Sequence, residues 1–310
     1  MDPLAAYRGR DLDEGAYLRA IEELDLEAVE WDAATLAEVR DFLGPWQHNI
    51  RLPHGVHTAY WEALYPPHEE MMSVVARELR GGFAGKRVLD LGCLEGYFAV
   101  ECSLQGATVV AVEGKIKNLR KCEFVRSALG IDETRLRLVR DDVMNVTRAA
   151  YGSFDAVLAL GLLYHLADPF QFLANLAAVC DEFVLIDTHI AFEEKVQALP
   201  DDWHPPLSPL TELTYRGKSY FGRWYREFEP GTPQLAKDLS VAASLTDDAA
   251  VWLVEDSLVA LLHDVGFPQV AKISFAKSEG TWWSNLEKEA RVLYLASKRP
   301  EGFRSRVFPT

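Results

Sequence analysis

Three acidic residues end successive apolar segments of the chain, and two glycines follow the first of them. In VLDLGCLEGYFAVE, Asp90 ends an aliphatic run, and Gly92 and Gly96 precede what reads as a helix. Gly92 permits a sharp turn, and Gly96 lets the following helix approach closely, so that its N-terminal amides face a crevice. Such a turn would suit a charged or zwitterionic small molecule.

The other two acids extend the same predicted crevice. Glu113 ends TVVAVE, 21 residues beyond Gly92, and can accept hydrogen bonds from both hydroxyls of a ribose. Asp142 follows the next apolar segment, where the amino group of an adenine could be bound. A dinucleotide is disfavoured because Leu94 and Tyr97 replace the second and third glycines of G-x-G-x-x-G. The pattern predicts an adenosine whose far end is an amino acid.

Two histidines that follow later apolar segments could accept a proton. His165 stands beside Tyr164 in LLYHLADP, and an imidazole titrates in the range that a general base needs. His189 ends EFVLIDTH, with Asp187 two residues earlier on the same face. His165 could instead cap or pack its loop, and both interpretations stay open. Two ligands are too few for a metal site, so none is predicted.

A stretch rich in aromatic and basic residues lies between positions 191 and 250. From Thr211 to Glu229, 6 of the 19 residues are aromatic and four are Arg or Lys. Alternation about Arg216-Gly217-Lys218 predicts a β-hairpin. This flap could stack on an acceptor and contact an anionic group, or form a second core or a homodimer surface. The predicted substrate contacts are His48, Tyr215, Tyr220, Arg223 and Trp224.

An alternating fold is needed to bring these residues together. From position 69 the chain alternates helices of about ten residues or more with short aliphatic strands, which predicts a doubly wound α/β sheet with helices on both faces. The predicted strands are 87–91, 108–113, 135–139, 154–160, 182–190, 269–275 and 291–297. Because the carboxyl ends of parallel strands lie at the same edge of a sheet, the acidic residues and the histidines should meet at that edge.

The flanking regions differ in pattern from this core. Residues 12–43 have helical apolar spacing that stops at Gly44-Pro45, and 45–67 show no sustained period. The strand and helix rhythm breaks after His189 and resumes near 251. The predicted division is a helical N-terminal extension and loop at 1–68, a Rossmann-like core at 69–190, an insertion or lid at 191–250, and the C-terminal part of the core at 251–310.

Composition narrows the class of protein. The 310 residues are 49% hydrophobic, which is enough for a full core, and the net charge is −15. The first 44 residues hold 12 acidic and 4 basic side chains, so a nucleic-acid partner is disfavoured. No leader or membrane-spanning pattern is visible, and we expect a cytoplasmic protein. The four scattered cysteines predict reduced thiols.

Taken together, the motifs resemble those of the class I S-adenosylmethionine (SAM)-dependent methyltransferases. VLDLGCLEGYFAVE resembles their glycine motif, TVVAVEG the ribose-binding strand end, LVRDDV the adenine-side aspartate, and FDAVLALGLLYHLADP the fourth strand with its loop. The resemblance covers 69–190 and, more loosely, 251–298. It implies a seven-stranded sheet with a reversed last hairpin and SAM across its carboxyl edge, with S-adenosylhomocysteine (SAH) as product. The implied cofactor contacts are Asp90, Gly92, Cys93, Gly96, Tyr97, Glu113, Gly114, Asp142, Val143, Leu160 and Tyr164. Leu94 and Glu95 stand where many members have a small residue.

A narrower resemblance is to the enzymes that finish wobble-uridine side chains in tRNA. The segments PWQHNIRLPHGVHT, LYHLADP and RVLYLASK are similar to theirs. Those enzymes use a carboxylated SAM and have a lysine shortly after the proline-tryptophan pair. Gln47 and His48 occupy that place here, while Arg291 matches a basic residue near their C-terminus. Ordinary SAM is therefore the expected cofactor.

Three hypotheses for the function follow. The first is a cytoplasmic methyltransferase that acts on a small organic acceptor of secondary metabolism, at oxygen, nitrogen or carbon. His165 or His189 would be its general base. The second is a tRNA wobble-uridine methyltransferase, and the third is a SAM-binding protein without transferase activity. The acidic charge and the lid-like insertion favour the first.

Overall fold

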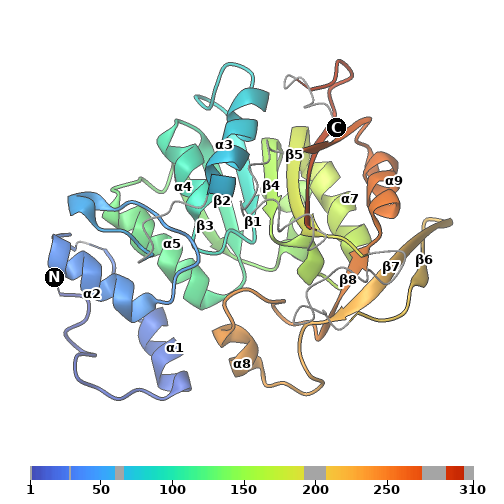
Figure 1. The fold of residues 1–310 in the computed structure, drawn as a ribbon. Coiled ribbons are helices and arrows are strands. Elements are labelled where there is room, and N and C mark those ends of the chain that lie inside the picture. The colour runs from blue at the N-terminus through green and yellow to red at the C-terminus, as the bar shows by residue number, and fades with distance from the viewer. Residues whose placement is uncertain (1, 28, 60–65, 192–206, 274–290, 304–310) are drawn as a thin grey trace.

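The computed structural model describes residues 2–27, 29–59, 66–191, 207–273 and 291–303 (Figure 1). The first part of the predicted insertion, 192–206, lies outside the described residues. Among the described residues, no helix combines the length and the apolar character needed to span a bilayer.

A seven-stranded sheet forms the centre of the protein. Its strands lie in the order β3-β2-β1-β4-β5-β10-β9. They span Leu136–Arg140 (β3), Thr108–Glu113 (β2), Arg87–Leu91 (β1), Phe154–Leu160 (β4), Cys180–His189 (β5), Arg291–Ser297 (β10) and Gln269–Ile273 (β9). The strands β1 to β5 pair in parallel, and β10 runs antiparallel to both β5 and β9. The predicted α/β fold class, with its reversed last hairpin, is confirmed.

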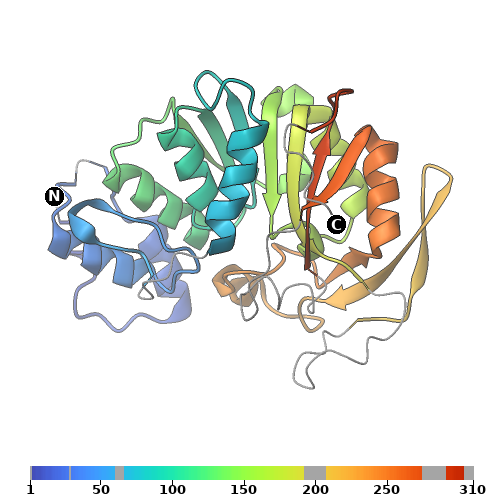
Figure 2. The same ribbon diagram turned by 45° about the horizontal axis from the view of Figure 1, so that its top comes forward.

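Helices cover both faces of this sheet (Figures 1 and 2). The longer ones are α3 (Pro66–Glu78), α4 (Tyr97–Leu104), α5 (Ile116–Ala128), α7 (Pro169–Val179) and α9 (Glu255–Val265). Short helical turns complete the crossovers: η2 (Val143–Asn145), α6 (Arg148–Tyr151) and η3 (Leu163–His165). Successive strand residues enter opposite cores, since Val109 belongs to the buried cluster that contains residues of α4 and α5, whereas Val110 belongs to the cluster that contains residues of α7. This period of two explains why the strands read as continuous apolar runs.

The N-terminal extension packs beside the core on α5. The helical spacing of 12–43 predicted a helical extension, and the structure has two helices there, α1 (Glu14–Glu22) and α2 (Ala33–Leu43). Each begins at an aspartate, because the side chains of Asp13 and Asp32 accept hydrogen bonds from backbone amides of the first turn. A short 3-10 turn, η1 (Pro53–Gly55), follows.

The insertion forms a second, three-stranded sheet. Strand β6 (Thr211–Tyr215) pairs antiparallel with β7 (Lys218–Arg226) across Arg216 and Gly217, whose φ angles of 50° and 77° suit a two-residue hairpin turn. Strand β8 (Ala249–Leu253), which the sequence did not predict, pairs with the other edge of β7. Helix α8 (Gln234–Leu239) precedes it and contacts α1, so the insertion and the extension meet. The domain boundaries at 68, 190 and 250 stay predictions.

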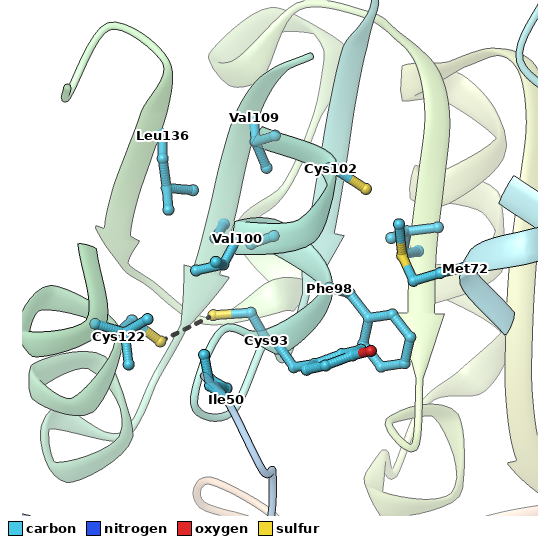
Figure 3. Packing of buried hydrophobic residues seen from close by; sticks show 14 of the residues in the cluster. Ile50, Met72, Cys93, Phe98, Val100, Cys102, Val109, Cys122 and Leu136 are labelled. Atoms are coloured by element: carbon cyan, nitrogen blue, oxygen red, sulfur yellow. Dashed lines mark hydrogen bonds between the residues drawn. The ribbon is translucent and has the colours of Figure 1, made fainter. Parts of the chain in front are cut away.

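All four cysteines are buried and free. Cys93, on the glycine turn, faces Cys122 of α5 with a sulfur to sulfur distance of 3.7 Å (Figure 3). The thiol of Cys122 also donates to the carbonyl of Leu94. The pKa of Cys122 is raised, chiefly by burial, so the thiol stays protonated and serves packing behind the turn.

Candidate functional site

The glycine turn between β1 and α4 is held in a strained, compact shape. Gly92, Leu94 and Gly96 all have positive φ angles, of 62°, 54° and 84°. A Cβ on Gly96 would lie 3.1 Å from Sγ of Cys122, and one on Gly92 would lie 2.9 Å from Cδ1 of Leu162. The turn therefore needs glycine at both places, for conformation and for space.

Asp90 presents a buried carboxylate beneath this turn. It is 2% exposed, and burial, with a smaller effect of Glu113, raises the pKa of Asp90 to about 7. The backbone amide of Ala99 donates to it, but Oδ2 has no hydrogen-bond partner among the described residues. A buried polar atom without a partner is rare, and Asp90 is one of the residues that line the cavity described below.

Glu113 ties the end of β2 to the glycine turn. Its two carboxylate oxygens accept from the amides of Leu94 at 3.0 Å and Lys115 at 2.8 Å. Burial raises the pKa of Glu113, and these hydrogen bonds oppose that rise. Each oxygen keeps a second lone pair, so a fixed carboxylate remains able to accept from a ligand's hydroxyls.

The strand ends meet at one cavity of about 280 Å³. Among its lining residues are eleven of the predicted site residues: His48, Asp90, Gly92, Cys93, Glu113, Gly114, Asp142, Val143, Leu160, Tyr164 and His165. Two predicted cofactor contacts lie behind it: Gly96 caps α4, and the ring of Tyr97 packs against His48 and His68. Among the described residues, no group of three or more His, Cys, Asp or Glu side chains is arranged to hold a metal ion.

Glu95, in the glycine turn, anchors a segment of the extension to the cavity wall. Its carboxylate accepts from the amides of Gln47 at 2.9 Å and His48 at 2.6 Å. It also pairs with Lys121 of α5 at 2.8 Å, and Lys121 donates further to the carbonyl of Pro45. The residue that departs from the family's small-residue pattern thus holds residues 45–48 against the turn. No motif in the sequence predicts this pair, whose members stand 26 positions apart.

A second group of polar side chains lines the same cavity. Asp187 of β5 and Arg291 of β10 form a two-pronged ion pair, with Nε of Arg291 at 3.0 Å from Oδ1. The ring of His68 meets that of His48 edge-on at 4.8 Å. Burial lowers the pKa of His48 to about 4 and that of His68 to about 3. At neutral pH this part of the cavity therefore carries two neutral imidazoles and one compensated charge pair.

The two predicted general bases have different surroundings. Nδ1 of His165 lies 2.6 Å from Oε1 of Glu227, a residue of the insertion whose side chain is 3% exposed, and His165 lines the cavity. His189 is not among the lining residues, because its ring stacks on Trp252 at 4.8 Å and meets Tyr164 edge-on. Its expected neighbour Asp187 pairs with Arg291 instead. Of the two predicted bases, His165 is therefore the one that lines the cavity, and its catalytic role stays a prediction.

The insertion closes one side of the cavity. Its lining residues include 241–247, which we call the cover. Lys115 donates to the carbonyl of Ser240 at 2.8 Å, and Asn118 donates to that of Val241 at 3.1 Å. Leu245 lies so near Gly114 that a Cβ there would be 2.5 Å from Cδ2. The cover therefore lies directly over the strand end that carries Glu113.

Four predicted substrate contacts lie outside the cavity. Tyr215 and Tyr220 pack against Phe170, and the hydroxyl of Tyr220 donates to Asp264. Arg223 donates to the carbonyl of Ser208, and Trp224 is 39% exposed. The hairpin directs Tyr215 and Tyr220 into the core beside α7 and Trp224 to the surface, so we omit all four residues from the proposed site. A homodimer through this surface stays a prediction.

Comparisons with known proteins place the chain among methyltransferases. A family model described as a methyltransferase domain matches residues 60–228, more than half of the chain. The structure is similar to that of the N-terminal domain of EvdMO1, determined in the presence of SAH and D-fucose. The TM-score is 0.62 at 25% identity, and the similarity covers 87% of this chain and 98% of the other.

Curated relatives match over shorter regions. A tRNA U34 carboxymethyltransferase of Methylococcus capsulatus is 32% identical over 139 residues, which are 43% of this chain and 39% of that protein. A ubiquinone biosynthesis O-methyltransferase of Psychrobacter cryohalolentis is 30% identical over 89 residues, 28% of this chain and 34% of the relative. The chain thus spans only about a third to two fifths of the length of these relatives.

Proposed function

This chain belongs to the methyltransferase domain family, and we propose that it transfers a methyl group from SAM to a small organic acceptor held beneath the insertion. The observation that carries the proposal is one cavity that joins the acids of three strand ends to His165. The expected resemblance to class I methyltransferases is confirmed by the family match and the fold.

The residues present suit SAM. Glu113 would accept hydrogen bonds from the ribose hydroxyls, Asp142 would lie at the adenine, and the glycine turn over Asp90 would receive the amino acid end. The unpartnered Oδ2 of Asp90 and the fixed carboxylate of Glu113 support this assignment. When bound, SAM supplies an electrophilic methyl group on a sulfonium, and the leaving group is the neutral thioether of SAH.

The chain's own part in the reaction is to position the acceptor, exclude water and take up a proton. The cover and the segment 45–48 enclose the cavity, which favours exclusion of water. His165 would accept the proton of the attacking hydroxyl or amine at Nε2, since Nδ1 is engaged by Glu227. Tyr164 and Leu160 would flank the reacting atoms.

Two observations support a small acceptor. The cavity is partly covered by the insertion, and the similar EvdMO1 domain was crystallised in the presence of a free sugar. A tRNA acceptor is the second candidate, favoured by the match to the tRNA U34 carboxymethyltransferase. The net charge of −15 weighs against it, because a polyanion would be repelled at long range.

A transfer assay with methyl-tritiated SAM separates these candidates. Wild-type protein and His165→Gln are incubated with a panel of hydroxylated and aminated small molecules, and in parallel with bulk tRNA at low salt. We expect label in a small molecule, with kcat about 10²- to 10⁴-fold lower in His165→Gln. Label in tRNA alone would overturn the proposal in favour of the second candidate. SAH binding without transfer to either class of acceptor would favour a non-catalytic SAM-binding protein.

A further inference from the structure

One carboxylate connects the cover to the predicted base. Glu227 follows β7, and its Oε1 lies 2.6 Å from Nδ1 of His165. Its Oε2 accepts from the backbone amide of Ser244, at 3.3 Å. Ser244 belongs to the cover and is 3% exposed. His165 and Ser244 stand 62 and 17 positions from Glu227 in the sequence, so it is the tertiary structure that brings the three residues together.

The contact with Nδ1 fixes the chemistry of the imidazole. A carboxylate is an acceptor and has no proton to donate, so neutral His165 must carry its proton on Nδ1. The lone pair then lies on Nε2, where a proton can be accepted. Glu227 is not among the residues that line the cavity, so it acts through His165 as a positioning residue.

The contact with Ser244 makes this orientation depend on the cover. Ser244 can donate to Glu227 only while the cover lies over the end of β2, where Lys115, Asn118 and the packing of Leu245 on Gly114 hold it. Displacement of the cover removes one of the two partners of the carboxylate. A buried carboxylate with one partner lost must turn or take up water to replace it.

We propose that Glu227 couples closure of the cover to the proton-accepting tautomer of His165, so that the base is ready to take the acceptor's proton when the cover is closed. The inference rests on the proposed function. In the step that it supports, the acceptor oxygen or nitrogen forms a bond to the methyl carbon, and the bond from that carbon to sulfur breaks with its electron pair moving to sulfur. The acceptor's proton passes to Nε2 of His165.

The tautomer can be measured without knowledge of the acceptor. Long-range ¹H–¹⁵N spectra of histidine-labelled protein, recorded with and without SAH, report which nitrogen is protonated, and His165→Gln assigns the signal. We expect the Nδ1–H tautomer in the wild type and a mixed population in Glu227→Gln, because an amide can donate to Nδ1 as well as accept. An unchanged His165 signal in Glu227→Gln would overturn the positioning role.

The coupling to the cover has its own variants. Gly114→Val should displace Leu245, and with it the cover, and so disturb the His165 tautomer, although the side chains of Glu227 and His165 are unchanged. Gly114→Val/Leu245→Ala, which restores room, should recover the wild-type signal. A wild-type signal in Gly114→Val, or no recovery in the double variant, would overturn the coupling. Calorimetry with SAH tests the proposed function independently of this inference. Absence of SAH binding by the wild type would refute the proposed function, whereas the spectra decide the role of Glu227.

Discussion

Glu95 and Lys121 form an ion pair from which water is excluded, with Nζ 2.8 Å from Oε1 and both side chains 0% exposed. The pair joins the glycine turn to α5, and its hydrogen bonds to the backbone of residues 45–48 bring the extension to the cavity. Nζ of Lys121 also lies 4.9 Å from the ring centre of Trp46. A residue type unusual for this turn is thus the anchor of a wall of the site.

Lys121→Met should destabilise the protein by about 3–5 kcal/mol, because it leaves the carboxylate of Glu95 buried without its cation. Lys121→Met/Glu95→Gln should recover part of this loss, since no uncompensated charge remains. Urea unfolding measures both free energies. A double variant less stable than the single one would show that the charge pair is not what stabilises this wall.

Arg291→Met should cost a similar amount, about 3–5 kcal/mol, because Asp187 is 2% exposed and loses its partner. The matched control is Arg148→Met, which breaks a pair with Asp181 whose side chains are 55% and 47% exposed. There we expect at most about 1 kcal/mol. Equal losses in the two variants, measured by urea unfolding, would contradict the burial argument.

Gly92→Val should abolish SAH binding, because its Cβ would meet Leu162 at 2.9 Å and close the backbone approach. Gly130→Val is the matched control, since Gly130 has the same φ of 62° and nothing within 4 Å of an added Cβ. Both variants suffer the same backbone strain, of about 1–2 kcal/mol. Calorimetry should therefore show binding retained in Gly130→Val, and retained affinity in Gly92→Val would place the ligand elsewhere.

The stability of the protein should depend on pH through Asp90. Its pKa is about 7 in the folded state, against an ordinary value of 3.8, so between these values the native state holds a proton that the unfolded state has lost. Stability should therefore fall as pH rises from about 4 to about 7, by about 4 kcal/mol in total, and stay level above. Urea unfolding of the wild type and Asp90→Asn at pH 5 and pH 8 isolates this contribution.

In Asp90→Asn the fall between the two pH values should be smaller by about 2.5 kcal/mol than in the wild type. The exposed Asp25 offers a control, since Asp25→Asn should leave the wild-type dependence intact. An identical pH dependence in the wild type and Asp90→Asn would show that Asp90 ionises normally.

The fold and much of the cofactor side could be predicted from the sequence, because local signals define them. Strands β1, β2 and β4 are aliphatic runs, and the acids at their ends need no tertiary information to be placed at one sheet edge. The glycines of the turn follow from backbone conformation alone.

The acceptor side could not be predicted in the same way. Glu227, Lys121 and His68 carry no motif, and each becomes part of the site through partners far along the chain. The aromatic residues of the hairpin were predicted to contact the substrate, but they do not line the cavity. Alternation along a strand predicts which side chains share a face, but not what that face contacts. Strand β8 was missed because AAVWL is short and follows a polar stretch.

The most direct test of the account is calorimetric titration of the wild type and Glu113→Ala with SAH. The account predicts saturable one-to-one binding by the wild type and a dissociation constant at least about tenfold higher in Glu113→Ala, a difference of about 1.4 kcal/mol from the lost ribose contacts. No binding by the wild type, or equal affinity in the two proteins, would contradict the assignment of this cavity to SAM.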